Sequence, residues 1–184
     1  MADSGVGNLH RWIGKPEEWT RVVGPLVASK YQRGSTVEEQ LIQTAISIEA
    51  LGYSVALREG QVRRGTSLSF PQYLKRIHET LDCSVKEVIA GSPQNEIPAF
   101  NNCEEWAEAF NEVYKQAKHA DHPLPDPLRA VVLTDAGALL VRLYFAPEFG
   151  VERERLEQAS STRVDGTRPT KSPRPTLWLT GALQ

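Results

Sequence analysis

The sequence is short of the features that mark metal-binding, secreted and membrane-spanning proteins. Its 184 residues include only two cysteines, Cys83 and Cys103, which form no CxxC pair and no plausible zinc set. No apolar run approaches the roughly 20 residues of a helix that spans a bilayer. The N-terminus has no basic head followed by an apolar stretch, so no secretory signal is expected. These absences predict a cytoplasmic protein without a membrane segment.

The net charge is also small, and the sequence has few signals of β-strands. The formal net charge of −2 produces no global field toward nucleic acid, so any contact with RNA has to be local. A hydrophobic content of 40% and a charged content of 24% are typical of a globular chain with a core. Few stretches alternate with period two, whereas many follow the 3.6-residue period of a helix. The sequence therefore predicts an all-α bundle of four to five main helices.

Capping signals and prolines divide the chain into helices. Thr36 and Glu39 have the spacing of a capping box. Asn101 or Asn102 is expected to cap a later helix, and Asp126 and Pro127 suit the cap and first turn of the last one. The expected helices cover about residues 16–28, with a break suggested at Gly24-Pro25, then 36–58, 69–81, 102–119 and 127–145, with a brief helix at 84–90.

Apolar residues at helical spacing predict which faces are buried. The expected buried stripes are Leu41, Ala45, Ile48 and Val55; Trp106, Phe110, Val113 and Ala117; and Val132, Ala136, Leu139, Leu140 and Leu143.

The composition also predicts three regions. Residues 1–15 are Gly-rich and polar and are expected to be a flexible N-terminus, and residues 16–156 are expected to form one helical domain. Residues 157–184 are rich in Ser, Thr, Pro and Arg, which predicts a disordered tail. Within this tail, Leu177, Trp178 and Leu179 are apolar and could dock elsewhere.

Residues 115–122 read KQAKHADH and hold two of the four histidines. On one helix, Asn111, Lys115, Lys118 and His122 form a polar stripe, and His119 lies beside it. A solvated helix surface explains this pattern directly, because cations near a helix C-terminus complement its dipole.

A chemical interpretation uses the same residues. Histidine acts as base or acid near neutral pH, and a lysine can stabilise the negative charge of a phosphate in the transition state. His119, His122 and a lysine could therefore cut RNA without a metal, since the 2′-hydroxyl is an internal nucleophile. A metal held by His119, Asp121 and His122 is the weaker alternative, because the neighbouring lysines repel a cation.

Two segments carry a resemblance to a known family. Residues 41–52 (LIQTAISIEALG) resemble the "ALEAL" helix of the HEPN superfamily. Residues 110–122 (FNEVYKQAKHADH) resemble the "YNxxKHAD" helix end of its ApeA-like branch, which takes the place of the R-x4-6-H element of HEPN ribonucleases. Residues 139–143 (LLVRL) fit the closing helix of that fold, and the resemblance covers about residues 9–150.

The resemblance implies a helical bundle that dimerises, so that the motifs of two chains form a composite cleft. In catalytic members this cleft cuts RNA without metal, commonly in phage-defence or toxin–antitoxin systems, and no cofactor is expected. The implied partners are RNA or a nucleotide, a second copy, and an antitoxin or other protein. An additional N-terminal domain often precedes this branch's HEPN part, whereas about 35 residues precede the Leu41 helix here. The chain is thus expected to be a short form or the C-terminal part of a larger ancestor.

The motif's arginine is absent, and Lys115 keeps its spacing to His122 with six intervening residues. Lysine lacks arginine's bidentate fork, so the replacement changes how a phosphate is held. The candidate catalytic residues are His119, His122, Lys115, Lys118, Asp121, Asn111 and Glu49.

Glu49 is a candidate because it shares a helical stripe with Ile42, Ile46 and Tyr53, which predicts partial burial. A buried carboxylate needs a partner. We expect Glu49 to face the KHAD helix and to pair with Lys115, Lys118 or His119. A structural ion pair that only fixes helix packing is the equal alternative.

Two hypotheses of different classes follow. The first is a metal-independent HEPN endoribonuclease acting at a dimer interface, which the two histidines and Asp121 favour. The second is a non-catalytic HEPN module that binds RNA, a nucleotide or a protein partner, which the missing arginine favours. A purely structural helical adaptor is a third.

Overall fold

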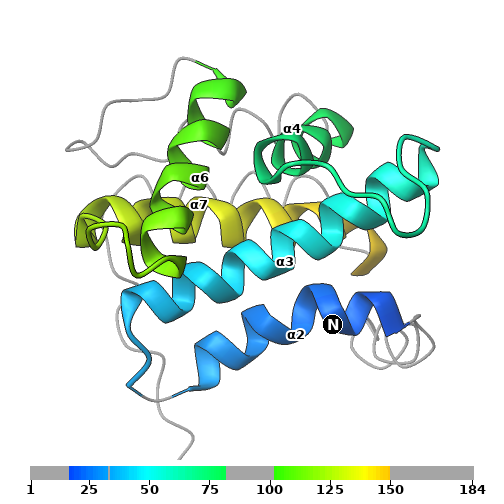
Figure 1. Ribbon diagram of the computed structural model, residues 1–184. Helices are drawn as coiled ribbons and strands as arrows, with labels where there is room; N and C mark the ends of the chain where they lie inside the picture. The colour runs from blue at the N-terminus through cyan, green and yellow to red at the C-terminus, as the bar shows by residue number, and fades with distance from the viewer. Residues whose placement is uncertain (1–16, 33, 82–101, 150–184) are drawn as a thin grey trace, which may run out of the picture.

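The computed structural model of the chain describes residues 17–32, 34–81 and 102–149, and these residues form a helical bundle (Figure 1). The described part contains no strand, so the predicted all-α class with four to five main helices is confirmed. Its elements are α2 (Glu17–Tyr31), α3 (Val37–Arg58), α4 (Phe70–Thr80), α6 (Cys103–Lys118), α7 (Pro127–Phe145) and the short 3-10 helix η1 (Ala146–Phe149).

Helix α3 is the centre of the bundle. It contacts α2, α4, α6 and α7, and Figure 1 shows α2 running along one side of it, with α4 and α6 on the other and α7 behind. Because α3 touches every other long helix, residues on different faces of α3 reach different neighbours. A site that includes α3 therefore draws on several segments that are distant in sequence.

The helix starts follow the predicted capping residues. Thr36 and Glu39 form the capping box, in which the Glu39 N–H donates to Thr36 Oγ1 at 3.2 Å and the Thr36 N–H donates to Glu39 Oε2 at 3.0 Å. Asn102 Oδ1 accepts from the Glu105 N–H at 2.9 Å. These bonds satisfy backbone donors that the first turn of a helix leaves unpaired.

The break expected at Gly24-Pro25 is wrong, because α2 continues through Pro25 to Tyr31. Proline removes one helical hydrogen bond and would ordinarily end or bend a helix. Here α2 packs along α3, where it buries Val22 and partly buries Leu26. Burial of this apolar face outweighs the local cost of the proline.

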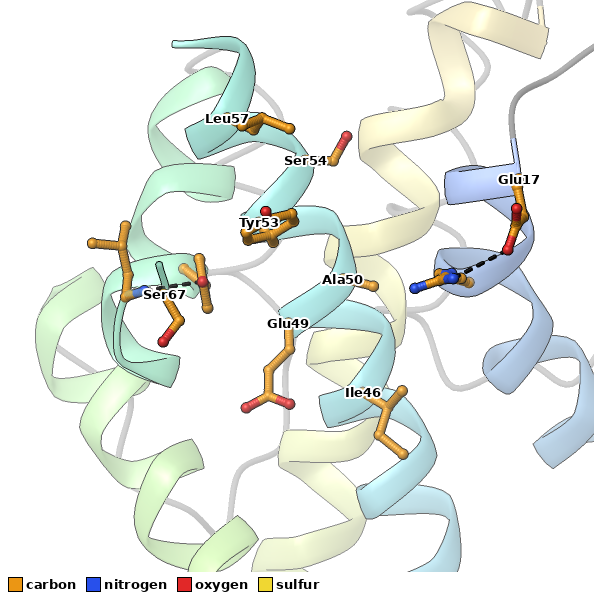
Figure 2. A pocket seen from close by; sticks show the side chains of 11 residues that line it. Glu17, Ile46, Glu49, Ala50, Tyr53, Ser54, Leu57 and Ser67 are labelled. Atoms are coloured by element: carbon orange, nitrogen blue, oxygen red, sulfur yellow. Dashed lines mark hydrogen bonds and ion pairs between the residues drawn. The ribbon is translucent and has the colours of Figure 1, made fainter. Parts of the chain in front are cut away.

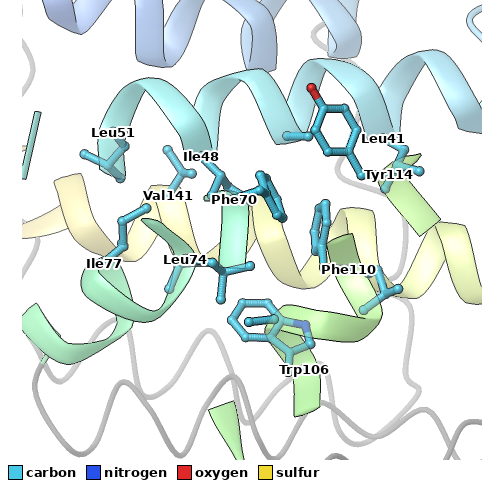
Figure 3. Packing of buried hydrophobic residues seen from close by; sticks show 14 of the residues in the cluster. Leu41, Ile48, Leu51, Phe70, Leu74, Ile77, Trp106, Phe110, Tyr114 and Val141 are labelled. Atoms are coloured by element: carbon cyan, nitrogen blue, oxygen red, sulfur yellow. The ribbon is translucent and has the colours of Figure 1, made fainter. Parts of the chain in front are cut away.

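The core forms where α3, α4, α6 and α7 meet (Figure 3). The predicted stripes of α3 and of the Trp106 helix point inward, although Ala117 is only partly buried. On α7 the prediction is partly wrong: Leu133 and Val141 are fully buried, whereas Val132, Ala136 and Leu139 are only partly buried. Helix α7 is apolar around most of its circumference, so periodicity alone does not identify its buried face.

Three expectations fall outside the described residues: the flexible N-terminus at 1–15, the brief helix at 84–90 and the disordered tail at 157–184. Across the helices that are described, none combines the length and the apolar character needed to cross a membrane.

Candidate functional site

The KHAD motif lies at the end of α6 rather than along it. Helix α6 ends at Lys118, and His119 is its C-cap, with an extended backbone and an N–H that donates to the Lys115 carbonyl oxygen at 3.0 Å. The His122 N–H then donates to the His119 carbonyl oxygen at 3.1 Å, which closes a tight turn. The helix thus ends before His122, in line with its expected end at about residue 119, and the polar stripe drawn through Lys115 and Lys118 does not extend to His122. The turn instead sets the position of His122 relative to His119.

This turn brings the two imidazoles together. Their ring centroids are 6.1 Å apart with an angle of 49° between the ring planes, and both side chains are exposed. Two rings at this separation can contact opposite sides of one small anionic group, such as a phosphodiester. We name His119 and His122 the histidine pair.

The other motif candidates surround the histidine pair more loosely. Lys115, Lys118 and Asp121 are exposed, and Asn111 is partly buried farther back on α6. In the described ranges, no side-chain hydrogen bond or ion pair joins Lys115 or Asp121 to either imidazole. The structure therefore brings the histidines together but does not attach Asn111, Lys115 or Asp121 to them.

Glu49 faces α6, as expected from the sequence, and its cationic neighbour there is Lys118. Partial burial raises the pKa of the Glu49 carboxyl, while the Lys118 charge and a hydrogen bond from Tyr114 act in the opposite direction. The Lys118 ammonium also lies 5.3 Å from the centroid of the Tyr114 ring, within cation–π range. Glu49, Tyr114 and Lys118 form what we call the carboxylate cluster.

Tyr114 is the member of this cluster that the sequence did not single out. Its side chain is buried, and burial raises the pKa of its hydroxyl, as does the neighbouring Glu49 carboxylate. The hydroxyl therefore keeps its proton at neutral pH and can donate it in a hydrogen bond to Glu49. Tyr114 and Lys118 are four residues apart on α6, and this i,i+4 spacing was the signal that could have identified the pair.

Glu49 also borders an open groove of about 620 Å³ along the outer face of α3 (Figure 2). The groove lies between the first turns of α2 and the segment that leads into α4. Its lining residues are Glu17, Arg21, Ile46, Glu49, Ala50, Tyr53, Ser54, Leu57, Ser67, Leu68 and Tyr73. Glu49 thus belongs both to the groove and to the carboxylate cluster, which connects the groove to the end of α6.

No family model matches the chain, and no curated protein or solved structure is significantly similar to it. Its function has to be inferred from the geometry of α3 and α6 together with the motifs in the sequence.

Glu49→Gln is expected to raise the free energy of unfolding more at pH 7 than at pH 4. Because the folded-state pKa of Glu49 is raised, its favourable contribution is complete below the unfolded pKa of about 4.3 and is lost as pH rises through the folded pKa. Glutamine cannot ionise, yet it keeps an oxygen that can accept from Tyr114. Since Glu49 is only half-buried, solvent screening limits the difference to less than about 1 kcal/mol. Urea unfolding at the two pH values measures it.

Lys118→Met supplies the matched control. It removes the positive charge that lowers the pKa of Glu49, so the stability of this variant should fall more steeply than that of the wild type between pH 4 and pH 7. Identical pH dependences for the wild type and both variants would show that Glu49 is not part of a coupled cluster.

Proposed function

We propose that this chain is a HEPN-like domain that cleaves RNA without metal at the interface of two copies, in a phage-defence or toxin–antitoxin type system. The histidine pair is the observation that carries this proposal, because two exposed imidazoles lie 6.1 Å apart beside two exposed lysines. The helical bundle and the resemblance of residues 41–52 and 110–122 to HEPN motifs support it. Without the exposed histidine pair, the fold alone would favour no reaction.

The proposed chemistry needs only groups that the chain supplies. One neutral imidazole takes the proton of an RNA 2′-hydroxyl, and the 2′-oxygen forms a bond to the adjacent phosphorus. The bond from phosphorus to the 5′-oxygen breaks, and the other imidazole, protonated, gives its proton to that oxygen. A lysine ammonium stabilises the added negative charge on the phosphorus centre. The products are a 2′,3′-cyclic phosphate and a 5′-hydroxyl.

Exposed apolar side chains next to the histidine pair support the dimer in this proposal. Leu124 is 77% exposed and Leu128 is 50% exposed, and they follow His122 in the turn and at the start of α7. Apolar side chains at this exposure are compatible with a contact between copies that places two histidine pairs near each other.

The test is an RNA cleavage assay in EDTA, comparing the wild type with His119→Ala/His122→Ala. The wild type should release fragments with cyclic phosphate ends, and the double variant should lose this activity while keeping its helical circular dichroism spectrum. His78→Ala, which changes a histidine on α4 outside the motif, should cleave like the wild type. Equal cleavage by the wild type and the double variant, or no cleavage by the wild type, would show that the histidine pair does not cleave RNA.

A second candidate is a non-catalytic HEPN module that binds RNA, a nucleotide or a protein partner. The observation that favours it is the position of Lys118, which interacts with Glu49 and Tyr114 of its own chain. Because the Glu49 carboxylate already compensates part of the positive charge of Lys118, this lysine can stabilise the negative charge of a transition state less strongly. For this candidate, fluorescence anisotropy should show RNA binding that weakens with salt and with Lys115→Ala, in the absence of cleavage.

A further inference from the structure

The groove exposes an apolar strip on the outer face of α3. Ile46, Ala50, Tyr53 and Leu57 follow one another at three- and four-residue intervals, and Figure 2 shows them along the side of α3 between α2 and Ser67. Ile46 is 38% exposed, and the other three are partly exposed. Ala50 packs partly against the main core, and Tyr53 and Leu57 pack partly against the cluster of Ala56, Val62 and Tyr73, so the strip keeps only part of its apolar surface in the groove. An occupant of the groove would bury this remaining surface.

The described chain ends beside this groove. The ring of Phe145, the last residue of α7, lies 4.4 Å from the ring of Trp19, in the first turn of α2. Tyr144 lies at the end of α3, where its hydroxyl accepts a hydrogen bond from Arg58 and its ring centroid is 5.9 Å from the guanidinium carbon. The end of α7 therefore lies at the end of the groove that Glu17 and Leu57 line (Figure 1).

The sequence after this point contains a segment whose chemistry suits the groove. Leu177-Trp178-Leu179 is the only run of three large apolar residues outside the described ranges. Arg168, Lys171 and Arg174 precede it, and they make this part of the chain basic. The groove has the opposite balance, with the carboxyl groups of Glu17 and Glu49 against the single guanidinium of Arg21.

The chain is also long enough for this segment to reach the groove. Trp178 follows Phe149 by 29 residues, which can span up to about 95 Å when extended. The strip from Ile46 to Leu57 covers eleven residue steps of helix, or roughly 17 Å. Because the connection is within one chain, the segment also has a high effective concentration at the groove.

We propose that Leu177-Trp178-Leu179 docks in the groove of its own chain, with Trp178 against Ile46 and Tyr53 and with Arg174 directed toward Glu49. Tryptophan is well suited as the anchor, because it buries a large apolar area and is enriched at the centres of interfaces. The docked segment covers the apolar strip beside Glu49. This inference is independent of RNA cleavage.

Photo-cross-linking in the full chain tests the docking. Trp178→p-benzoylphenylalanine places a photoreactive ring at the proposed anchor, and mass spectrometry then locates the bonds that form on irradiation. The expected result is intrachain cross-links to residues 46–57 or 67–73. Mixing ¹⁵N-labelled and unlabelled chains separates links within a chain from links between copies. Links only between copies, links only to other surfaces, or no links would overturn the proposal.

Two single changes in that cross-linkable chain make the test specific. Ile46→Lys puts a charge in the apolar strip at a position that is already 38% exposed, and it should lower the groove cross-links about fivefold. Val27→Lys is the matched control, because Val27 is 47% exposed on α2 and does not line the groove. It should leave the yield unchanged. Unchanged yield with Ile46→Lys, or an equal loss in both variants with native circular dichroism spectra, would overturn the assignment. If the N-terminal segment with Trp12 occupied the groove instead, the cross-links from position 178 would form only to residues outside the groove.

Discussion

Phe110→Ala is expected to lower the free energy of unfolding by about 3–5 kcal/mol, the largest effect of any single change considered for this chain. Phe110 has no exposed surface, and its ring centroid lies 5.2 Å from that of Phe70 on α4 (Figure 3). On its other side it approaches Gly137 of α7. The ring thus fills the space where three helices meet, and alanine would leave a cavity there. Urea unfolding followed by circular dichroism measures the loss.

Two variants on the same helix control this prediction. Phe110→Leu retains much of the apolar volume and should cost clearly less than Phe110→Ala. Glu108→Ala changes an exposed residue of α6 and should stay within about 0.5 kcal/mol of the wild type. A loss of less than about 1 kcal/mol for Phe110→Ala would contradict the packing of α6 between α4 and α7.

The position of Phe110 also matters for the candidate site. Tyr114 follows it by four residues and Lys118 by eight, so all three belong to neighbouring turns of α6. The packing of Phe110 sets how α6 rotates against α3, and this rotation determines whether Tyr114 and Lys118 meet Glu49. Phe110→Ala should therefore also change the pH dependence of stability that Glu49 produces.

Local signals in the sequence predict the helix starts well. Thr36, Asn102 and Asp126 all cap the helices expected of them, because each interaction is made within three residues. Where tertiary contacts decide, the prediction is less accurate. Contacts with α3 carry α2 through Pro25, and the buried face of α7 depends on neighbours that its nearly uniform apolar sequence does not identify.

The candidate site shows the same division. The proximity of Glu49 and Lys118 follows from helical stripes and from the general need of a buried carboxylate for a partner. The closeness of His119 and His122 follows from their spacing, whereas the turn that orients them starts only where α6 ends at Lys118. The groove was not predicted, because it depends on how α2 and the segment before α4 flank α3, and no residue pattern within α3 contains that information. The catalytic roles of these residues stay predictions.

Gly52→Ala is expected to lower the free energy of unfolding by about 2–3 kcal/mol, although alanine is the better helix former. Gly52 of α3 lies against Tyr73 of α4: a Cβ atom there would lie 2.4 Å from Tyr73 Cβ and 2.9 Å from Tyr73 Cα. Neither atom can move by rotating a side chain, so the two helices would have to separate. Tyr73 lines the groove and its hydroxyl accepts a hydrogen bond from the Leu68 N–H at 2.9 Å, so this shift also reaches the groove.

Gly137→Ala is the matched comparison, since it makes the same chemical change in another buried helical glycine. Its new Cβ would meet Phe110 Cε2 at 2.7 Å and the ends of the Ile48 and Thr44 side chains at 3.0 Å. These are side-chain atoms, which can shift without moving a neighbouring backbone, and the gain in helix propensity offsets part of the strain. The expected loss is therefore about 1–2 kcal/mol, less than for Gly52→Ala. Urea unfolding of both variants gives the order. An equal or larger loss for Gly137→Ala would contradict this order. It would mean that α3 and α4 can move apart more easily than the side chains around Phe110 can shift, so that the contact between Gly52 and Tyr73 does not determine the shape of the groove.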